Sequence, residues 1–91
     1  MTIENLNCFV LLAEELNFTR AAEKAHISQS TMSRRIDNVE AELGTRLFFR
    51  DQHVVTLTDA GKALYQHIAP ILTGYSDIVT RVQNIGNGLP D

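Results

Sequence analysis

Three short segments of helical apolar spacing fill the first 44 residues, and each is bounded by residues that start or stop helices. Thr2 is a suitable N-cap for the first helix, Asn17 ends it, and Thr19 opens a short second helix. Ser28 is a suitable N-cap for the third helix, which stops at Gly44, a typical C-terminal stop residue. We therefore expect three helices before residue 45, packed on one another as a core.

The apolar side chains of these helices recur at intervals of three or four residues, so each helix has one face for the core. In the second helix, the pair Ala21 and Ala22 would let another helix approach closely. Cys8 is interpreted as a small core or boundary residue, because no cation flanks it to stabilise a thiolate. The expected inward positions are Ile3, Leu6, Phe9, Val10, Ala13 and Leu16 in the first helix, and Met32, Ile36, Val39 and Leu43 in the third.

The apolar spacing changes after residue 46. A short apolar run at residues 47–49 is followed by the polar tetrapeptide 50–53 and a second apolar run at residues 54–57, which is typical of a small β-hairpin. Thr58 and Asp59 then suit the start of a fourth helix, as N-cap and acidic first-turn residue. The fold predicted is mainly α with a small β-hairpin.

A heptad pattern runs along the fourth helix and predicts a partner helix. Leu64 is placed to pack on the chain's own core, whereas the later positions have too little domain left to cover them. Pro70 predicts a kink or a local break, and residues 86–91 have linker composition. We expect a homodimer through these helices, in parallel or antiparallel pairing. Its contact residues would be Leu64, Ile68, Ile71, Tyr75, Ile78, Val82 and Ile85.

Charge and composition exclude several classes of protein. Eight Lys and Arg against eleven Asp and Glu give a net charge of -3, so the chain is no bulk polycation that coats nucleic acid. A single cysteine fits a reducing cytosol, and the start has neither the basic nor the apolar region of a signal peptide. We expect a cytoplasmic protein without membrane contact, because no run of about 18 apolar residues occurs.

Enzyme chemistry finds no support in the sequence. The three histidines, His26, His53 and His67, lack metal-ligand spacing, and no nucleophile motif or glycine-rich phosphate loop is present. We expect neither catalysis nor a cofactor in this chain.

The polar face of the third helix carries the functional signal. Its first half holds hydrogen-bonding side chains and cations, whereas its acids, Asp37, Glu40 and Glu42, begin in the second half. Residues 19–36 hold four cations against Glu23 alone, a local charge of +3. This polarity is typical of a recognition helix, whose first turns reach base edges in the major groove. Gln29 could read adenine and Arg34 guanine or phosphate, while Ser30, Thr31 and Ser33 suit either phosphate or base.

The sequence resembles the winged helix-turn-helix domain of LysR-type transcriptional regulators. The resemblance rests on Leu6, Phe9, the run NFTRAAEKAHISQSTMSRRIDNVEAELGTRLF (17–48), Arg50 and LTDAG (57–61). It implies a winged helix-turn-helix with a three-helix core at residues 1–58, with the helix-turn-helix at about 18–37 and the wing at about 46–57. A linker and dimerisation helix with a tail would follow at residues 59–91. The tip at residues 51–53 is less basic than the family's usual wing.

The resemblance further implies a sequence-specific bacterial regulator that binds a dyad-symmetric promoter site as a dimer, with its third helix in the major groove. A small-molecule effector would bind a separate domain, expected to be absent from this chain, and a full-length protein could form higher oligomers. The alternative is a winged-helix protein-interaction module that contacts partners through Phe49 and the fourth helix. The DNA-binding residues expected are Thr19, Ser28, Gln29, Ser30, Thr31, Ser33, Arg34, Arg35, Arg50 and His53.

Overall fold

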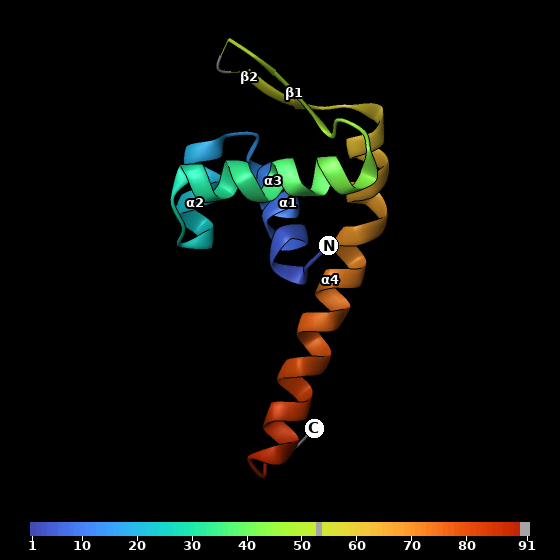
Figure 1. Cartoon of the computed structure of the whole chain (residues 1–91). Helices are drawn as coiled ribbons and strands as arrows, with labels where there is room; N and C mark the ends of the chain where they lie inside the picture. Colours follow the sequence, from blue (N-terminus) through green and yellow to red (C-terminus); the bar gives the residue numbers. More distant parts are fainter. Residues whose placement is uncertain (53, 90–91) are drawn as a thin grey trace.

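Four helices and one antiparallel hairpin follow one another in the computed structural model, which describes residues 1–52 and 54–89 (Figure 1). The predicted mainly helical fold with a small hairpin is confirmed, and the long final helix gives the molecule dimensions of 51 × 25 × 19 Å. The elements are α1 (Ile3–Glu15), α2 (Phe18–Ala25), α3 (Gln29–Leu43), β1 (Phe48–Asp51), β2 (Val54–Leu57) and α4 (Asp59–Gly86).

A polar side chain caps the start of every one of these helices. Thr2, Ser28 and Thr58 each accept a hydrogen bond from a backbone N–H three residues ahead, as predicted. The predicted start of α2 is wrong: Asn17 is its N-cap, and its Oδ1 accepts from the N–H of Arg20 at 2.9 Å. Two caps therefore sit within the short stretches that join α1 to α2 and α2 to α3, and they set where each helix turns.

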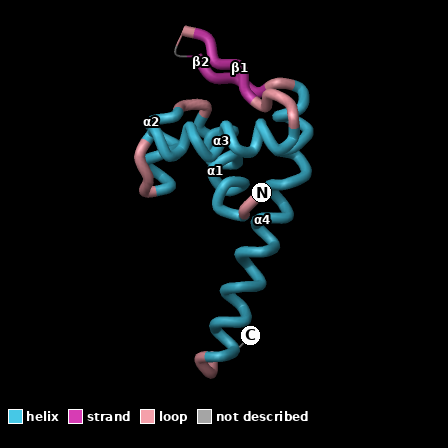
Figure 2. The backbone as a smooth tube through the Cα atoms, viewed as in Figure 1, coloured by secondary structure: helices cyan, strands magenta, loops and turns pink. Residues whose placement is uncertain are grey.

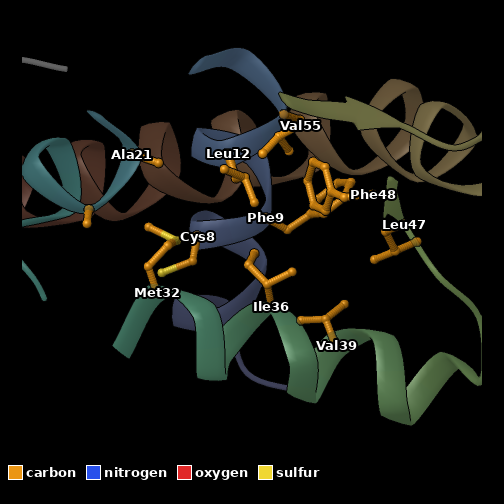
Figure 3. Packing of buried hydrophobic residues seen from close by; sticks show 12 residues of the cluster. Cys8, Phe9, Leu12, Ala21, Met32, Ile36, Val39, Leu47, Phe48 and Val55 are labelled. Atoms are coloured by element: carbon orange, nitrogen blue, oxygen red, sulfur yellow. The ribbon is translucent and has the colours of Figure 1, made fainter. Parts of the chain in front are cut away.

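The core lies between α1 and α3 and is closed by the hairpin. Phe9 and Leu12 of α1 are fully buried, and the ring centroids of Phe9 and Phe48 lie 5.4 Å apart (Figure 3). Ile3, Leu16 and Leu43, which we expected on inward faces, are 37%, 40% and 43% exposed, because each lies at a helix end beyond the reach of the core. Besides Phe9, Leu12 and Phe48, the buried apolar residues of this core are Cys8, Ala13, Ala21, Ala22, Met32, Ile36, Val39, Leu47 and Val55.

The hairpin is longer than its apolar residues suggested. Arg50 pairs with Val55 and Asp51 with Val54, so residues 50 and 51, expected in the turn, belong to β1. The turn includes Gln52, whose φ is 44°, and the predicted DNA contact His53 lies outside the described residues. Leu47, expected in the strand, precedes β1 and is buried.

We expected a kink or a local break at Pro70; helix α4 runs through this residue without interruption, so the break does not occur. Its first turns pack on the core, where Leu64, Tyr65 and Ile68 are partly buried. The Tyr65 hydroxyl donates to Glu14 Oε2 at 3.0 Å; this hydrogen bond, then burial and the charge of Glu14, raise the pKa of Tyr65 above its ordinary value. The remainder of α4 extends away from the other helices (Figure 2). No helix of residues 1–52 and 54–89 is long and apolar enough to cross a membrane.

A tight contact fixes α4 to the segment that precedes the hairpin. The Thr58 N–H donates to the Leu47 carbonyl at 3.0 Å, and the Thr58 hydroxyl donates to the Arg46 carbonyl at 2.8 Å. Gly61 is buried beside the same Leu47 carbonyl, and a Cβ at this position would lie 2.1 Å from that oxygen. A side chain on residue 61 would therefore push α4 away from the base of the hairpin.

We expect Gly61→Ala to lower the free energy of unfolding by about 1 to 3 kcal/mol, because the clash with a backbone carbonyl outweighs the gain in helix propensity. The matched control is Gly74→Ala in the same helix, where a Cβ would meet no atom within 4 Å. That change should raise stability by roughly 0.5 to 1 kcal/mol. Urea unfolding followed by circular dichroism measures both. A stability gain in both variants would contradict the close approach.

Candidate nucleic-acid interface

An open groove lies where the starts of α2 and α3 face the hairpin. In Figure 1 the hairpin runs back above α3, from the end of that helix toward its beginning. The groove has a volume of about 660 Å³. The groove is lined by Asn17, Phe18, Thr19, Gln29, Ser30, Ser33, Arg50, Asp51, Gln52, Val54 and Val55.

Three of the predicted contact residues on α3 line this groove. Gln29 and Ser30 are exposed in the first turn, and Ser33 is half-buried in the next. Arg34 is exposed and lies four residues after Ser30, so both side chains occupy one face of the helix. The first turns of α3 thus present amide, hydroxyl and guanidinium groups together, the set that hydrogen-bonds base edges and phosphates.

The hydroxyls at the start of α3 bond to one another. Ser28 Oγ donates to Thr31 Oγ1 at 2.9 Å and lies 3.1 Å from Ser30 Oγ. Ser28 also accepts from the N–H of Thr31 at 3.1 Å, so its first role is to cap the helix. This network holds the first turn of α3 in a fixed shape.

Fewer cations are unpaired on this face than the local charge of +3 for residues 19–36 suggests. Lys24 Nζ lies 2.7 Å from Glu15 Oε2, and Arg35 Nη1 donates to Cys8 Sγ at 3.7 Å, so both side chains engage α1. Within residues 1–52 and 54–89, Arg20 and Arg34 form no ion pair and are exposed. The positive charge of this face therefore rests mainly on two arginines at the starts of α2 and α3.

Arg50 occupies the side of the groove formed by β1. Its Nη2 lies 3.1 Å from Asp37 Oδ1 and 3.1 Å from Glu40 Oε1, and its guanidinium carbon is 5.1 Å from the centroid of the Phe18 ring. The side chain is 27% exposed. One residue of the wing thus contacts both helices of the helix-turn-helix.

Glu40 joins α3 to the start of the hairpin, a role that the sequence analysis did not predict. Its Oε2 accepts from the backbone N–H groups of Leu47 at 2.7 Å and Phe48 at 3.3 Å, while its other oxygen accepts from Arg50. The residue is 7% exposed. A signal was present, because Glu40 lies four residues after Ile36 and so shares the inward face of α3.

Asn17, Phe18 and Gln52 also line the groove and were not among the predicted contacts. The Asn17 cap could have been found from the preference of asparagine for this position. The places of Phe18 and Gln52 depend on how the hairpin folds over α3, which no local pattern encodes. Across the described residues, no three His, Cys, Asp or Glu side chains are grouped to hold a metal ion.

Comparison with known proteins identifies the family. Residues 3–62 match the family model described as "Bacterial regulatory helix-turn-helix protein, lysR family". The chain belongs to the LysR family. XapR of Escherichia coli K12, named an HTH-type transcriptional regulator, is 40% identical over 83 residues, which cover 91% of this chain and 28% of XapR. CatR of Pseudomonas putida, named likewise, is 41% identical over 88 residues, which cover 97% of this chain and 30% of CatR.

Solved structures of LysR-family domains share the fold. The BenM_DBD in its complex with benA site 1 DNA is 36% identical, with a TM-score of 0.84, and the match covers 93% of this chain and 99% of that one. The CbnR_DBD in its DNA complex is 30% identical, with a TM-score of 0.83 and coverages of 94% and 99%. This LysR-family chain is therefore a winged helix-turn-helix domain with a long C-terminal helix, as the resemblance implied. It spans less than a third of XapR or CatR.

We expect Glu40→Gln to lower the free energy of unfolding of this LysR-family domain by about 2 kcal/mol, because the amide cannot accept from both backbone N–H groups and neutralise Arg50. Glu42→Gln is the matched control. Glu42 Oε2 lies 2.8 Å from the terminal amine of Met1, but its side chain is 47% exposed. Its loss should cost less than about 1 kcal/mol. Thermal or urea unfolding compares the two, and equal losses would contradict the anchoring role of Glu40.

Proposed function

We propose that this LysR-family domain binds duplex DNA sequence-specifically, with the start of α3 in the major groove of the duplex. The observation that carries the proposal is the groove between α2, α3 and the hairpin, which is lined by polar side chains. Arg20 and Arg34 do not line the groove, but they add exposed positive charge without an ion pair to the same two helices within the described residues. The relatives solved with DNA, BenM_DBD and CbnR_DBD, support it through their shared fold.

Within this proposal, Gln29 and Arg34 read bases. The Gln29 amide can pair with N6 and N7 of adenine, and the Arg34 guanidinium with O6 and N7 of guanine. The hydroxyls of Thr19, Ser28, Ser30, Thr31 and Ser33 serve phosphates or base edges, together with the free N–H groups at the start of α3. Arg35 donates to Cys8 Sγ and so joins α3 to α1.

The wing contributes less charge than the helices. Asp51 lies in the groove, and Arg50 faces two carboxylates, so the described part of the wing presents little net positive charge to a phosphate backbone. With a net charge of -3 for the whole chain, we expect weak non-specific binding. Affinity then depends on base contacts and on the geometry of the dimer.

We further propose a homodimer through α4, bound to a dyad-symmetric site with two half-sites. The apolar heptad positions of α4, from Leu64 to Ile85, form a seam that leaves the core after Ile68. The exposed fractions of its later members are 62% for Ile71, 49% for Tyr75, 50% for Ile78, 60% for Val82 and 54% for Ile85. One apolar face of this length, without cover from its own domain, favours a second copy of the helix.

As part of a longer regulator, the domain would deliver the protein to a promoter while another domain binds a small-molecule effector. The regulatory names of XapR and CatR support a role in transcription rather than catalysis. Higher oligomers would form in that longer protein.

A protein-contact role for the wing has one specific observation in its favour. Phe49 and Val54 are 62% and 60% exposed and occupy the same face of the hairpin, opposite to the buried Phe48 and Val55. Failure of the domain to bind any duplex at low salt would favour this second function.

We expect Arg34→Ala to weaken binding by about 1 to 3 kcal/mol and to relax one position of the site, because a bidentate pair with guanine is lost. The site is first obtained by selecting bound duplexes from a random pool, and gel shifts then compare affinities. Arg46→Ala is the control, since Arg46 carries the same charge but lies beside the end of α3. Its 3.8 Å pair with Glu40 should contribute little, because the Arg46 side chain is 72% exposed. Equal losses in both variants, or no loss in Arg34→Ala, would contradict the assignment.

We expect Ile78→Glu to convert a dimer into a monomer, because a carboxylate would enter the apolar seam. Sedimentation velocity at tens of micromolar protein measures the mass. The affinity of the variant for a duplex with two half-sites should fall more than its affinity for a single half-site. Thr80→Glu introduces the same carboxylate at an exposed position of α4 outside the seam, and it should leave the dimer intact. A monomeric wild-type chain would overturn the dimer proposal.

A further inference from the structure

We infer that Arg50 is a positioning residue, which sets the hairpin against α2 and α3 and thereby the width of the groove, and that it does not bind a phosphate. The inference rests on the proposed function, because it assigns Arg50 a role in DNA selectivity. It differs from the expectation that Arg50 is itself one of the DNA-binding residues.

The first argument is geometric, because Arg50 joins β1 to α2 and α3, three of the four elements that line the groove. The residue belongs to β1; its Nη2 bonds Asp37 and Glu40 of α3, each at 3.1 Å, and its guanidinium lies 5.1 Å from the Phe18 ring at the start of α2. Planar guanidinium groups suit such a position, since they bond carboxylates through fixed N–H directions while one face stacks on a ring. The contacts thus hold β1, α2 and α3 at one relative placement.

The second argument is electrostatic, because the charge of Arg50 is already compensated. Two carboxylates lie within 3.1 Å of one nitrogen, and the side chain is only 27% exposed. To reach a phosphate, Arg50 would have to leave both carboxylates. Glu40, which is 7% exposed, would then keep, within the described residues, only the more distant Arg46, whose Nη1 lies 3.8 Å from Glu40 Oε1. Arg20 and Arg34, which form no ion pair within residues 1–52 and 54–89, are better placed for phosphates or bases.

A lysine separates the two roles. Lysine keeps the positive charge that a phosphate contact needs, but it cannot bridge two carboxylates and stack on Phe18 in the same fixed geometry. A phosphate contact would therefore survive largely in Arg50→Lys, whereas a positioning role would not. Arg50→Gln removes the charge and completes the comparison.

The experiment measures affinity for a selected duplex and for a scrambled duplex of equal length, by fluorescence anisotropy at several salt concentrations. We expect both Arg50→Lys and Arg50→Gln to lower the ratio of the two affinities roughly tenfold, the size of a lost base contact. The slope of log affinity against log salt should stay at the wild-type value in both. Circular dichroism confirms that each variant is folded.

Phe18→Leu is a third variant, in case the substitutions at Arg50 prevent folding. It changes no charge and removes only the ring beneath the guanidinium, so a reduced affinity ratio with an unchanged slope is again expected. Arg34→Ala, which should lower both the affinity and the ratio by loss of a direct contact, shows that the assay detects such a loss.

Three results would overturn the inference. The first is a slope that falls by about one in Arg50→Gln with equal losses on both duplexes, which marks a phosphate contact. The second is recovery of wild-type binding in Arg50→Lys, and the third is an unchanged affinity ratio in folded variants. A wild-type chain that does not distinguish the duplexes would instead refute the proposed function, and the role of Arg50 with it.

Discussion

The carboxylate of Glu40 holds the hairpin to α3, and the shape of the groove depends on it. It accepts from two successive backbone N–H groups, at Leu47 and Phe48, where the chain leaves the helical body to form β1. Without this acceptor both N–H groups would be buried and unpaired, which costs more than the hydrogen bonds themselves contribute. The same carboxylate faces Arg50, so one side chain fixes both the start of β1 and the residue that contacts α2 and α3.

Local signals in the sequence account for most of the fold. Thr2, Ser28, Thr58 and Gly44 mark helix ends by chemistry that acts over three or four residues, and the structure confirms them. The misplaced features depend on tertiary contacts. Arg50 was expected in a turn because it is polar, yet it lies in a strand because Asp37 and Glu40 of α3 satisfy its charge. The exposure of Leu43 likewise follows from where the core ends, which periodicity does not reveal.

The candidate site was predictable in outline and not in its charge distribution. The polar first half of α3 is read directly from the sequence, and Thr19, Gln29, Ser30, Ser33 and Arg50 indeed meet at one groove. The local charge of +3 was an overestimate of what this face presents, because Lys24 is paired with Glu15 from a different helix. A charge count along a segment cannot include partners that folding brings from elsewhere.

Leu47 also connects the groove to the proposed dimer helix. Its N–H donates to Glu40, its side chain is buried, and its carbonyl accepts from Thr58 and lies against Gly61 at the start of α4. The direction of α4 relative to α3 is therefore set by hydrogen bonds to both backbone groups of one residue, Leu47. In the proposed dimer, the distance between two recognition helices is the distance between half-sites. The spacing of the DNA site would then follow from how α4 leaves this junction, because a small rotation there is magnified along a helix of 28 residues.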